Sequence, residues 1–154
     1  MKARLGLVIF LVVLFLPDGV LANRSDFAKF KNTLQKVGFH ELPDRRLDDG
    51  SLMRVLQRID CLFEIECVFR GEKLHSLRIC FPEDFPQKTV VETVSYALPM
   101  FGREIKREEY FDIVRDMVSN PSNVCPYRCG DIVGRSIRGS YLEIPMRQLE
   151  FQAK

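Results

Sequence analysis

Hydrophobic and polar residues alternate along two neighbouring stretches in the middle of the chain. Residues 62–69 read LFEIECVF and residues 74–81 read LHSLRICF, with apolar residues at every second position. A period of two is typical of β-strands that bury one face. The intervening Arg70-Gly71-Glu72-Lys73 suits a turn, because glycine adopts a positive φ without steric cost. The pattern therefore predicts a β-hairpin.

The parity of this hairpin selects its register. A three-residue loop over 71–73 sets Phe63 against Phe81 and Ile65 against Ile79, whereas a two-residue loop mismatches the apolar faces. Apolar cross-strand pairs are each worth about 0.2–1 kcal/mol, and a one-residue slip reverses every face. We therefore expect the register with the three-residue loop.

Before the hairpin, apolar residues recur at helical spacing. Ser25 is expected to cap a helix that Gly38 ends, and Ser51 to cap a second, shorter helix. The first helix carries Phe27, Phe30, Leu34 and Val37, and the second carries Leu52, Val55, Leu56 and Ile59.

After the hairpin the periodicity is weaker. Residues 82–86 are expected to form a loop, and residues 89–98 a helix that begins with the spacing of a capping box, although their β-branched residues also fit a strand. Residues 107–119 predict a better helix, 125–130 a tight loop and 140–144 a final strand. Helices followed by a hairpin and a late strand predict an α+β domain. We expect short N-terminal helices packed on a small antiparallel sheet built on one β-hairpin, braced by disulfides.

The first 22 residues resemble a secretory signal peptide. Lys2 and Arg4 precede an apolar run over 5–16, and Ala22 offers a small residue for cleavage. The alternative, a membrane anchor, is disfavoured because the run is shorter than the roughly 20 residues that span a bilayer. We expect a secreted, single-domain protein of residues 23–154 that leaves the membrane after cleavage. Asn23-Arg24-Ser25 is a glycosylation sequon at its start.

Charge and motifs leave few catalytic options. Lys+Arg 23 against Asp+Glu 21 gives a net charge of +2, without the basic surface that phosphate contacts usually need. No phosphate-binding glycine loop, G-x-S-x-G or H-E-x-x-H is present, so we expect no cofactor and no metal. His40 lies beside Glu41 in an expected loop, and His75 on the apolar face of the hairpin opposite Phe69. Nothing brings them together, and a structural or surface role is favoured over acid–base catalysis.

Five cysteines in a secreted chain predict disulfides. The hairpin register directs Cys67 and Cys80 to opposite faces, which prevents a bond between them. We therefore expect each of them to form a disulfide with one of Cys125 and Cys129. The alternative, a zinc site, is disfavoured because it would need four converging ligands. Cys61 is the spare, either buried or paired between chains.

Several segments form an ordered set along the chain: Phe30 to Gly38, Ile65-Glu66-Cys67, Leu74 to Phe81, Cys125-Pro126 with Cys129-Gly130, and Leu142 to Pro145. This set resembles the C-terminal half of T2-type ribonucleases, which include the plant self-incompatibility ribonucleases. The resemblance implies a secreted RNA-related scaffold in which Cys67 bonds Cys129 and Cys80 bonds Cys125.

The catalytic motifs of that family are missing. They resemble F-x-x-H-G-L-W-P and H-E-W-x-K-H-G-T-C, and this chain contains no tryptophan. The leading hypothesis is therefore a secreted T2-ribonuclease-like protein without endonuclease activity, with weak RNA association as its expected contact to nucleic acid. The alternative is an unrelated small secreted binding or inhibitory protein, and the least favoured hypothesis is a hydrolase that uses His40 and His75.

Overall fold

The structure is a computed structural model that describes residues 24–101, 107–119 and 124–154. The expected signal peptide, residues 1–22, and the sequon residue Asn23 lie outside the described residues. Within the described ranges, three α-helices lie on one face of an antiparallel sheet of eight strands. The expected combination of helices and antiparallel strands is confirmed, but the sheet is much larger than one hairpin.

Helix α2 (Arg24–Gln35) forms where the helical spacing predicted it. Its aromatic residues Phe27 and Phe30 and its Leu34 are buried in the core, whereas Val37, beyond the helix end, is exposed. Gly38 has φ 95°, a left-handed conformation that glycine adopts without a Cβ clash. The N–H of Phe39 then donates to the carbonyl of Leu34 at 3.2 Å, which turns Phe39 back into the core.

The hairpin consists of β4 (Phe63–Arg70) and β5 (Lys73–Pro82). Ile65 pairs with Ile79, which confirms the expected register over most of the hairpin. The loop itself was predicted wrongly, because Arg70 pairs with Lys73 and the turn has two residues. A β-bulge after Val68 absorbs the difference in parity.

The segment expected to form a second helix is strand β3 (Leu52–Arg58). It pairs with β4 along its whole length, from Leu52 opposite Phe69 to Arg58 opposite Phe63. Its apolar residues also fit a helical period, but as a strand it satisfies backbone groups of β4 from Phe63 to Phe69, which a helix here would leave without these partners. A 3-10 turn (Ile59–Cys61) joins the two strands.

Two helices and three further strands follow the hairpin. Helix α3 (Gln87–Ala97) continues into a 3-10 turn (Leu98–Phe101), and α4 (Arg107–Ser119) has the expected bounds. The expected tight loop at 125–130 is instead mostly strand β6 (Val124–Cys129), paired with β7 (Ile132–Tyr141). The segment expected as a final strand, 140–144, instead contains the end of β7, a two-residue turn and the start of β8 (Ile144–Ala153). Leu142 and Glu143 form this turn and have positive φ.

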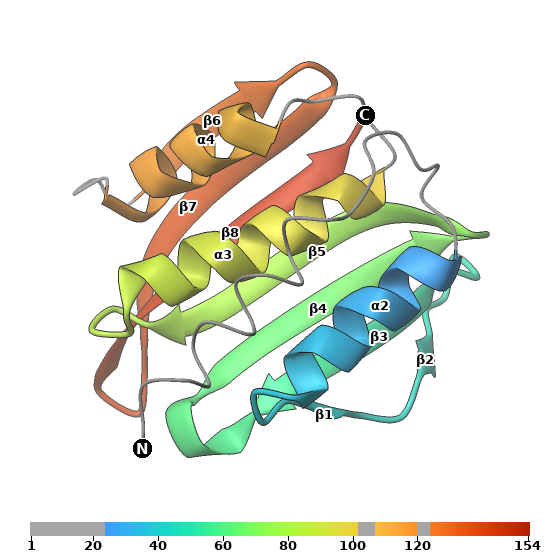
Figure 1. The fold of residues 1–154 in the computed structure, drawn as a ribbon, viewed down its shortest axis with the longest axis horizontal. Coiled ribbons are helices and arrows are strands. Elements are labelled where there is room, and N and C mark those ends of the chain that lie inside the picture. Colours follow the sequence, from blue (N-terminus) through green and yellow to red (C-terminus); the bar gives the residue numbers. More distant parts are fainter. Residues whose placement is uncertain (1–23, 102–106, 120–123) are drawn as a thin grey trace, which may run out of the picture.

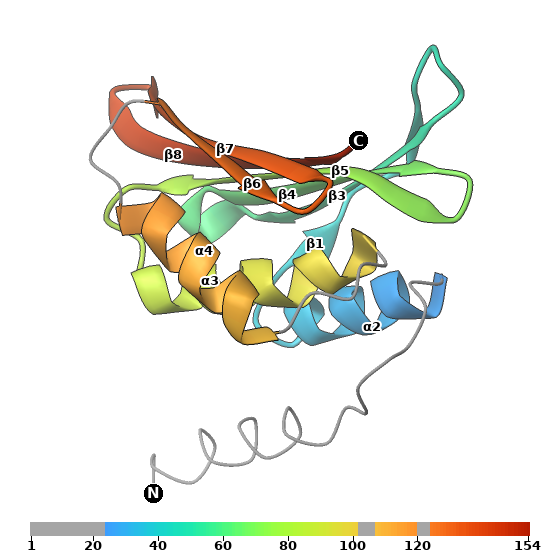
Figure 2. The same cartoon turned by 90° about the horizontal axis from the view of Figure 1, so that it is seen from above.

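The strand order is β1-β3-β4-β5-β8-β7-β6, so two three-stranded meanders meet where β5 pairs with β8. Two short strands, β1 (His40–Glu41) and β2 (Arg45–Arg46), pair with the outer side of β3, and β6 forms the opposite edge. Figure 1 shows α2 over the first meander and α4 over the second, with α3 between them. The edge-on view in Figure 2 shows that all three helices cover the same face and leave the other face open.

Phe63 is the centre of an aromatic cluster between the sheet and the helix layer. Its ring is fully buried and lies 5.3 Å from Phe39, 5.7 Å from Phe81 and 5.0 Å from Phe85, measured between ring centroids. Edge-to-face and offset ring pairs add about 0.5–1.5 kcal/mol beyond the area they bury. This residue therefore links the segment after α2, the hairpin and the loop that leads to α3.

Replacement of Phe63 by alanine is expected to lower the free energy of unfolding by about 3–5 kcal/mol, because it leaves a cavity under three rings. Chemical denaturation followed by circular dichroism measures the change. The control is Ile59→Ala, whose side chain is 71% exposed, and we expect a change below about 0.5 kcal/mol there. Similar losses for both variants would contradict the assigned core.

Candidate functional site

Arg147 is a charged side chain on the covered face of the sheet. It lies on β8 in phase with Leu149 and Phe151, and like them it is almost fully buried, at 4% exposure. Burial of an unpaired guanidinium would cost several kcal/mol, so its partners decide whether the position is tolerable.

Those partners come from three other elements. The guanidinium donates to Ser136 Oγ of β7 at 2.9 Å and to the carbonyl of Met117 in α4 at 3.3 Å. It also pairs with Glu83 Oε1, just after β5, at 3.5 Å. Arg147 therefore ties the last turn of α4 to the sheet, and cationic groups are favourable at that end of a helix.

A second arginine approaches the same carboxylate. Arg138 Nε on β7 lies 2.7 Å from Glu83 Oε1, so one carboxylate lies between two guanidinium groups. The backbone N–H of Glu83 donates to the carbonyl of Pro145 at 2.9 Å, which fixes the carboxylate relative to the start of β8. These three side chains together carry one net positive charge.

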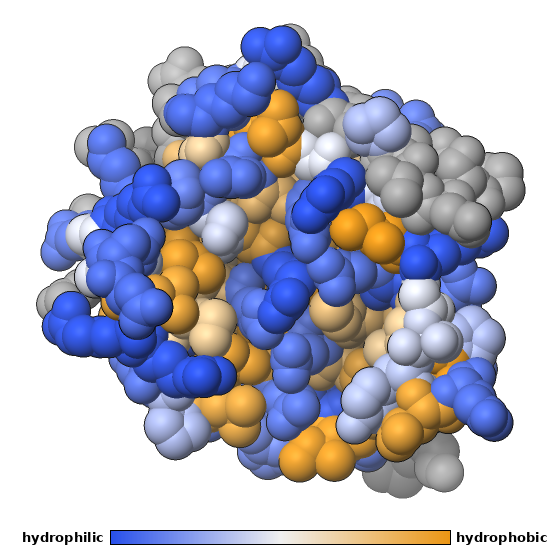
Figure 3. Space-filling view, turned by 180° about the vertical axis from the view of Figure 1, so that it is seen from behind, coloured by the Kyte–Doolittle hydropathy of each residue, from blue (hydrophilic) through white to orange (hydrophobic). Residues whose placement is uncertain are grey.

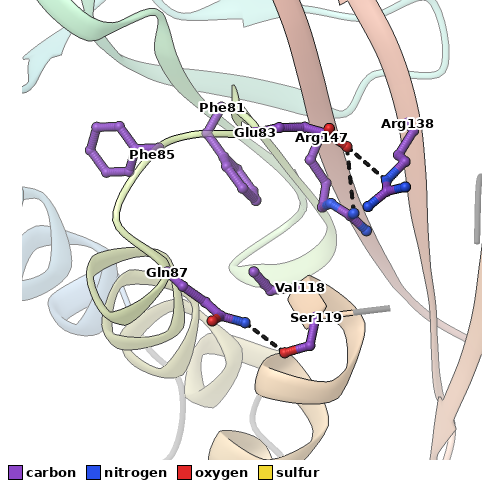
Figure 4. A pocket seen from close by; sticks show the side chains of 8 residues that line it. All are labelled: Phe81, Glu83, Phe85, Gln87, Val118, Ser119, Arg138 and Arg147. Carbon is purple, nitrogen blue, oxygen red and sulfur yellow. Dashed lines mark hydrogen bonds and ion pairs between the residues drawn. The ribbon is translucent and has the colours of Figure 1, made fainter. Parts of the chain in front are cut away.

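The three charged side chains form one wall of a pocket of ≈ 370 Å³. Figure 4 shows Phe81 and Val118 in the middle of this pocket, between the charged group and a hydrogen bond from Gln87 to Ser119 Oγ at 2.6 Å. Apolar surface thus separates a cationic end from a neutral polar end. The full lining is Phe81, Glu83, Phe85, Gln87, Val118, Ser119, Arg138 and Arg147.

This arrangement is suited to binding an anion rather than to group transfer. Arginine presents several N–H donors in a planar fork that matches a carboxylate. No described group of three or more histidine, cysteine, aspartate or glutamate side chains is arranged to hold a metal ion.

The two histidines lie far apart in the sheet. His40 is exposed on β1, and His75 is half-buried on β5, three strand positions away, with its Nε2 3.4 Å from Gln152 Nε2. The bulge sets Leu74 rather than His75 opposite Phe69, so the expected apolar environment of His75 was wrong. Arg45 and Arg46, the arginines that follow His40 in the sequence, are exposed on β2.

Three cysteines are free thiols in the structure: Cys61, Cys67 and Cys80. Cys67 is buried in the core and Cys80 lies on the open face, 3.5 Å from Gln148 Oε1, so the expected opposite orientations are confirmed. The disulfides that the resemblance implied for Cys67 and Cys80 are therefore not formed here.

The strand order gives the physical reason. The expected partners, Cys129 for Cys67 and Cys125 for Cys80, are both on β6. This strand lies four strand positions from β4, which carries Cys67, and three from β5, which carries Cys80. At about 4.8 Å per position these separations are roughly 19 and 14 Å, whereas bonded cysteines need Cα atoms within about 6.8 Å. The side chains of Cys125 and Cys129 themselves lie outside the described part of the structure.

The pocket residues were not found by the sequence analysis, although a signal for them exists. In the sequence Met146-Arg147-Gln148-Leu149-Glu150-Phe151, Arg147 alternates in phase with Leu149 and Phe151. A charged residue in the apolar phase of a strand indicates a buried ion pair. The strand predicted from the sequence ended at residue 144, so the alternation of Arg147 with Leu149 and Phe151 was not recognised.

The chain matches no protein-family model, no curated protein sequence and no solved structure. Among the described helices, none is long and apolar enough to cross a membrane.

Thiol reactivity is expected to follow burial. Burial raises the pKa of Cys67 far above its ordinary value and that of Cys80 to about 11, while Cys61 is the least enclosed of the three. Because the thiolate is the reactive form, alkylation of the native protein at about pH 8 should be fastest at Cys61, slower at Cys80 and undetectable at Cys67.

Peptide mapping by mass spectrometry measures this order. After unfolding in denaturant without reductant, Cys67 should become fully alkylated. A Cys67 that is modified only after reduction would show that it is in a disulfide and would contradict the free-thiol structure.

Proposed function

We propose that this chain is a binding protein that holds a small carboxylate-bearing ligand in the pocket of Arg138 and Arg147. The observation that carries the proposal is the buried Arg147, whose position is fixed by Ser136 and by the last turn of α4. A fixed guanidinium loses little freedom when it binds an anion, so more of the attraction is kept as affinity.

The charge balance of the pocket supports an anionic ligand. Glu83 pairs with both arginines, so these three side chains together carry one net positive charge beside a partly enclosed site. Arg138 is the more accessible of the two, with a side-chain exposure of 34%, and is the group that a ligand would contact first.

The apolar lining restricts the ligand further. Phe81 and Val118 lie beside the charged group, and a volume of ≈ 370 Å³ is near the lower end of ligand pockets, which span about 300–1,000 Å³. A compact acid with an apolar body, such as an aryl or short-chain carboxylate, fits these features. This is the binding-protein alternative of the sequence analysis, given a ligand class.

A relation to T2-type ribonucleases stays a separate proposal, supported by the sequence resemblance of the segments around Cys67 and Cys80. Residues 52–58 and 124–129 are strands, where the sequence pattern predicted a helix and a tight loop. Secretion after cleavage at Ala22 and glycosylation at Asn23 also stay predictions. These properties are compatible with a binding protein.

The ligand proposal is tested with benzoate and 3-phenylpropionate, each compared with its neutral amide. In two-dimensional NMR, the acids should shift the backbone signals of Val118, Ser119 and Arg147 with a dissociation constant in the millimolar range, ~1–10 mM. The neutral amides should bind about tenfold more weakly than the acids, because a charge-assisted hydrogen bond is lost.

Arg138→Gln should weaken acid binding by about tenfold for the same reason. The matched control is Arg70→Gln, because Arg70, at the end of β4, is another arginine paired with a carboxylate, that of Asp49 at 3.3 Å. It should leave binding unchanged. Equal affinity for acid and amide, or no shift at saturating concentration, would refute the proposed ligand class.

RNA cleavage separates the binding protein from a hydrolase. Cleavage of RNA by 2′-hydroxyl attack needs a placed base and acid, which together contribute about 10²–10⁴-fold or more. With His40 and His75 three strand positions apart, we expect no cleavage of single-stranded RNA above background at acidic or neutral pH. Cleavage that disappears in a His40→Ala/His75→Ala variant would overturn this expectation.

A further inference from the structure

The face of the sheet that the helices leave open has an ordered pattern of side chains. Figure 3 shows this face from behind the view of Figure 1, with hydrophilic and hydrophobic residues side by side over its surface. A hollow of ≈ 690 Å³ lies on it, lined by residues of β4 to β8.

Four charges form a row across the middle of this face. Glu66 on β4 pairs in register with Arg78 on β5, Arg78 with Glu150 on β8, and Glu150 with Arg135 on β7. The signs therefore alternate as minus, plus, minus, plus over four adjacent strands. Within the chain, Arg78 forms an ion pair with Glu66, and Arg135 forms one with Glu150.

The next row along the strands has its own symmetry. Val68 is opposite Ser76, Ser76 opposite Gln152, and Gln152 opposite Val133, which gives the order apolar, polar, polar, apolar. All four side chains are at least partly exposed. The order of residue types in this row is the same from either end. In the charged row, reversing the order inverts the sign of the charge at every position.

We propose that a second copy of this chain binds to the open face, related by a two-fold axis that runs parallel to the strands between β5 and β8. Such an axis reverses each row and keeps it at the same height. Glu66 then faces Arg135 of the second copy, and Arg78 faces Glu150 of the second copy. An axis along the row would instead place like charges opposite each other, which is unfavourable.

The uncharged row fits the same arrangement. Val68 faces Val133 of the second copy, and Ser76 faces Gln152 of the second copy. One operation thus satisfies charge, hydrogen-bonding and apolar complementarity, as an isologous interface requires. This proposal is independent of the ligand pocket, which lies on the covered side of the sheet.

The dimensions agree with sheet-on-sheet packing. Aligned sheets pack about 10 Å apart at about −30°, and the ends of a four-strand row lie about 7 Å from its centre. The angle of about 30° between the two sheets displaces those ends by about 3.6 Å. Arginine and glutamate side chains can span this distance. Six strands at about 4.8 Å spacing give a face of roughly 800 Å², the area that each partner of a standard interface buries.

One position is a mismatch that the proposal itself identifies. In the third row Glu64, Cys80, Gln148 and Ile137 are in register, so Glu64 faces Ile137 of the second copy. Burial, together with the neighbouring Glu66, already raises the pKa of Glu64. Glu64→Gln keeps an acceptor for Gln57 and removes the charge, so it should tighten the dimer by several-fold at neutral pH.

The test is the molecular mass of the full chain, expressed in a secreting host, measured by light scattering and sedimentation at ~1–100 μM. The wild type is expected to be a dimer that dissociates on dilution. Arg78→Glu places two like-charge contacts in the interface and should raise the dissociation constant by at least about tenfold. Inversion of the whole row, by Glu66→Arg, Arg78→Glu, Glu150→Arg and Arg135→Glu, should restore the dimer.

Arg115→Glu is the control, because Arg115 is an exposed, ion-paired arginine on α4 at the other side of the molecule. It should leave the dimer intact. A wild type that stays monomeric overturns the proposal, and so does a dimer that Arg78→Glu does not weaken. If Arg78→Glu does not fold, a wild-type dimer whose affinity fails to fall between low and ~0.5 M salt overturns it equally, because exposed ion pairs are screened.

Discussion

The pairing of β5 with β8 is the interaction on which the rest of this structure depends. It joins two meanders, each formed by strands adjacent in sequence, through seven residue pairs from Ser76–Gln152 to Pro82–Met146. The same pairing places Glu83, at the end of β5, beside Arg147 on β8. On the opposite face it brings Arg78 next to Glu150 and completes the charged row. Both surfaces discussed above therefore arise from one non-local contact.

Local pattern was enough to predict some elements and not others. The hairpin and helix α4 were predicted because their periods are unambiguous over eight or more residues. Strand β3 was not, because Leu52, Val55, Leu56 and Ile59 also satisfy a helical spacing. Only pairing with β4 decides between the two, and pairing is a tertiary effect that a single segment does not encode. Strand β6 was missed because Pro126 lies in a segment that was predicted to be a tight loop, and β8 because the predicted final strand ended before Pro145.

The candidate pocket depended on the same missing information. Arg138, Arg147 and Glu83 are separated by up to 64 residues in sequence, and none is part of a recognisable motif. The cysteines and histidines are the residues whose chemistry is recognisable from sequence, yet Cys67 is a buried core residue and the two histidines lie three strand positions apart. The resemblance to T2-type ribonucleases rests on a helix and on alternating strands that contain cysteine. Such segments also occur in a sheet whose strand order separates the cysteines.

The two edges of the sheet have a consequence for association of this protein in solution. An open edge is a template on which another chain can add a strand, and this route leads to aggregation. Here the outer side of β3 is covered by β1 and β2, each only two residues long and rich in charge. The other edge, β6, is six residues long and contains Pro126, which has no N–H to donate. Neither edge offers a long uninterrupted ladder, so growth by edge-to-edge addition is disfavoured and contacts between molecules are directed to the broad face.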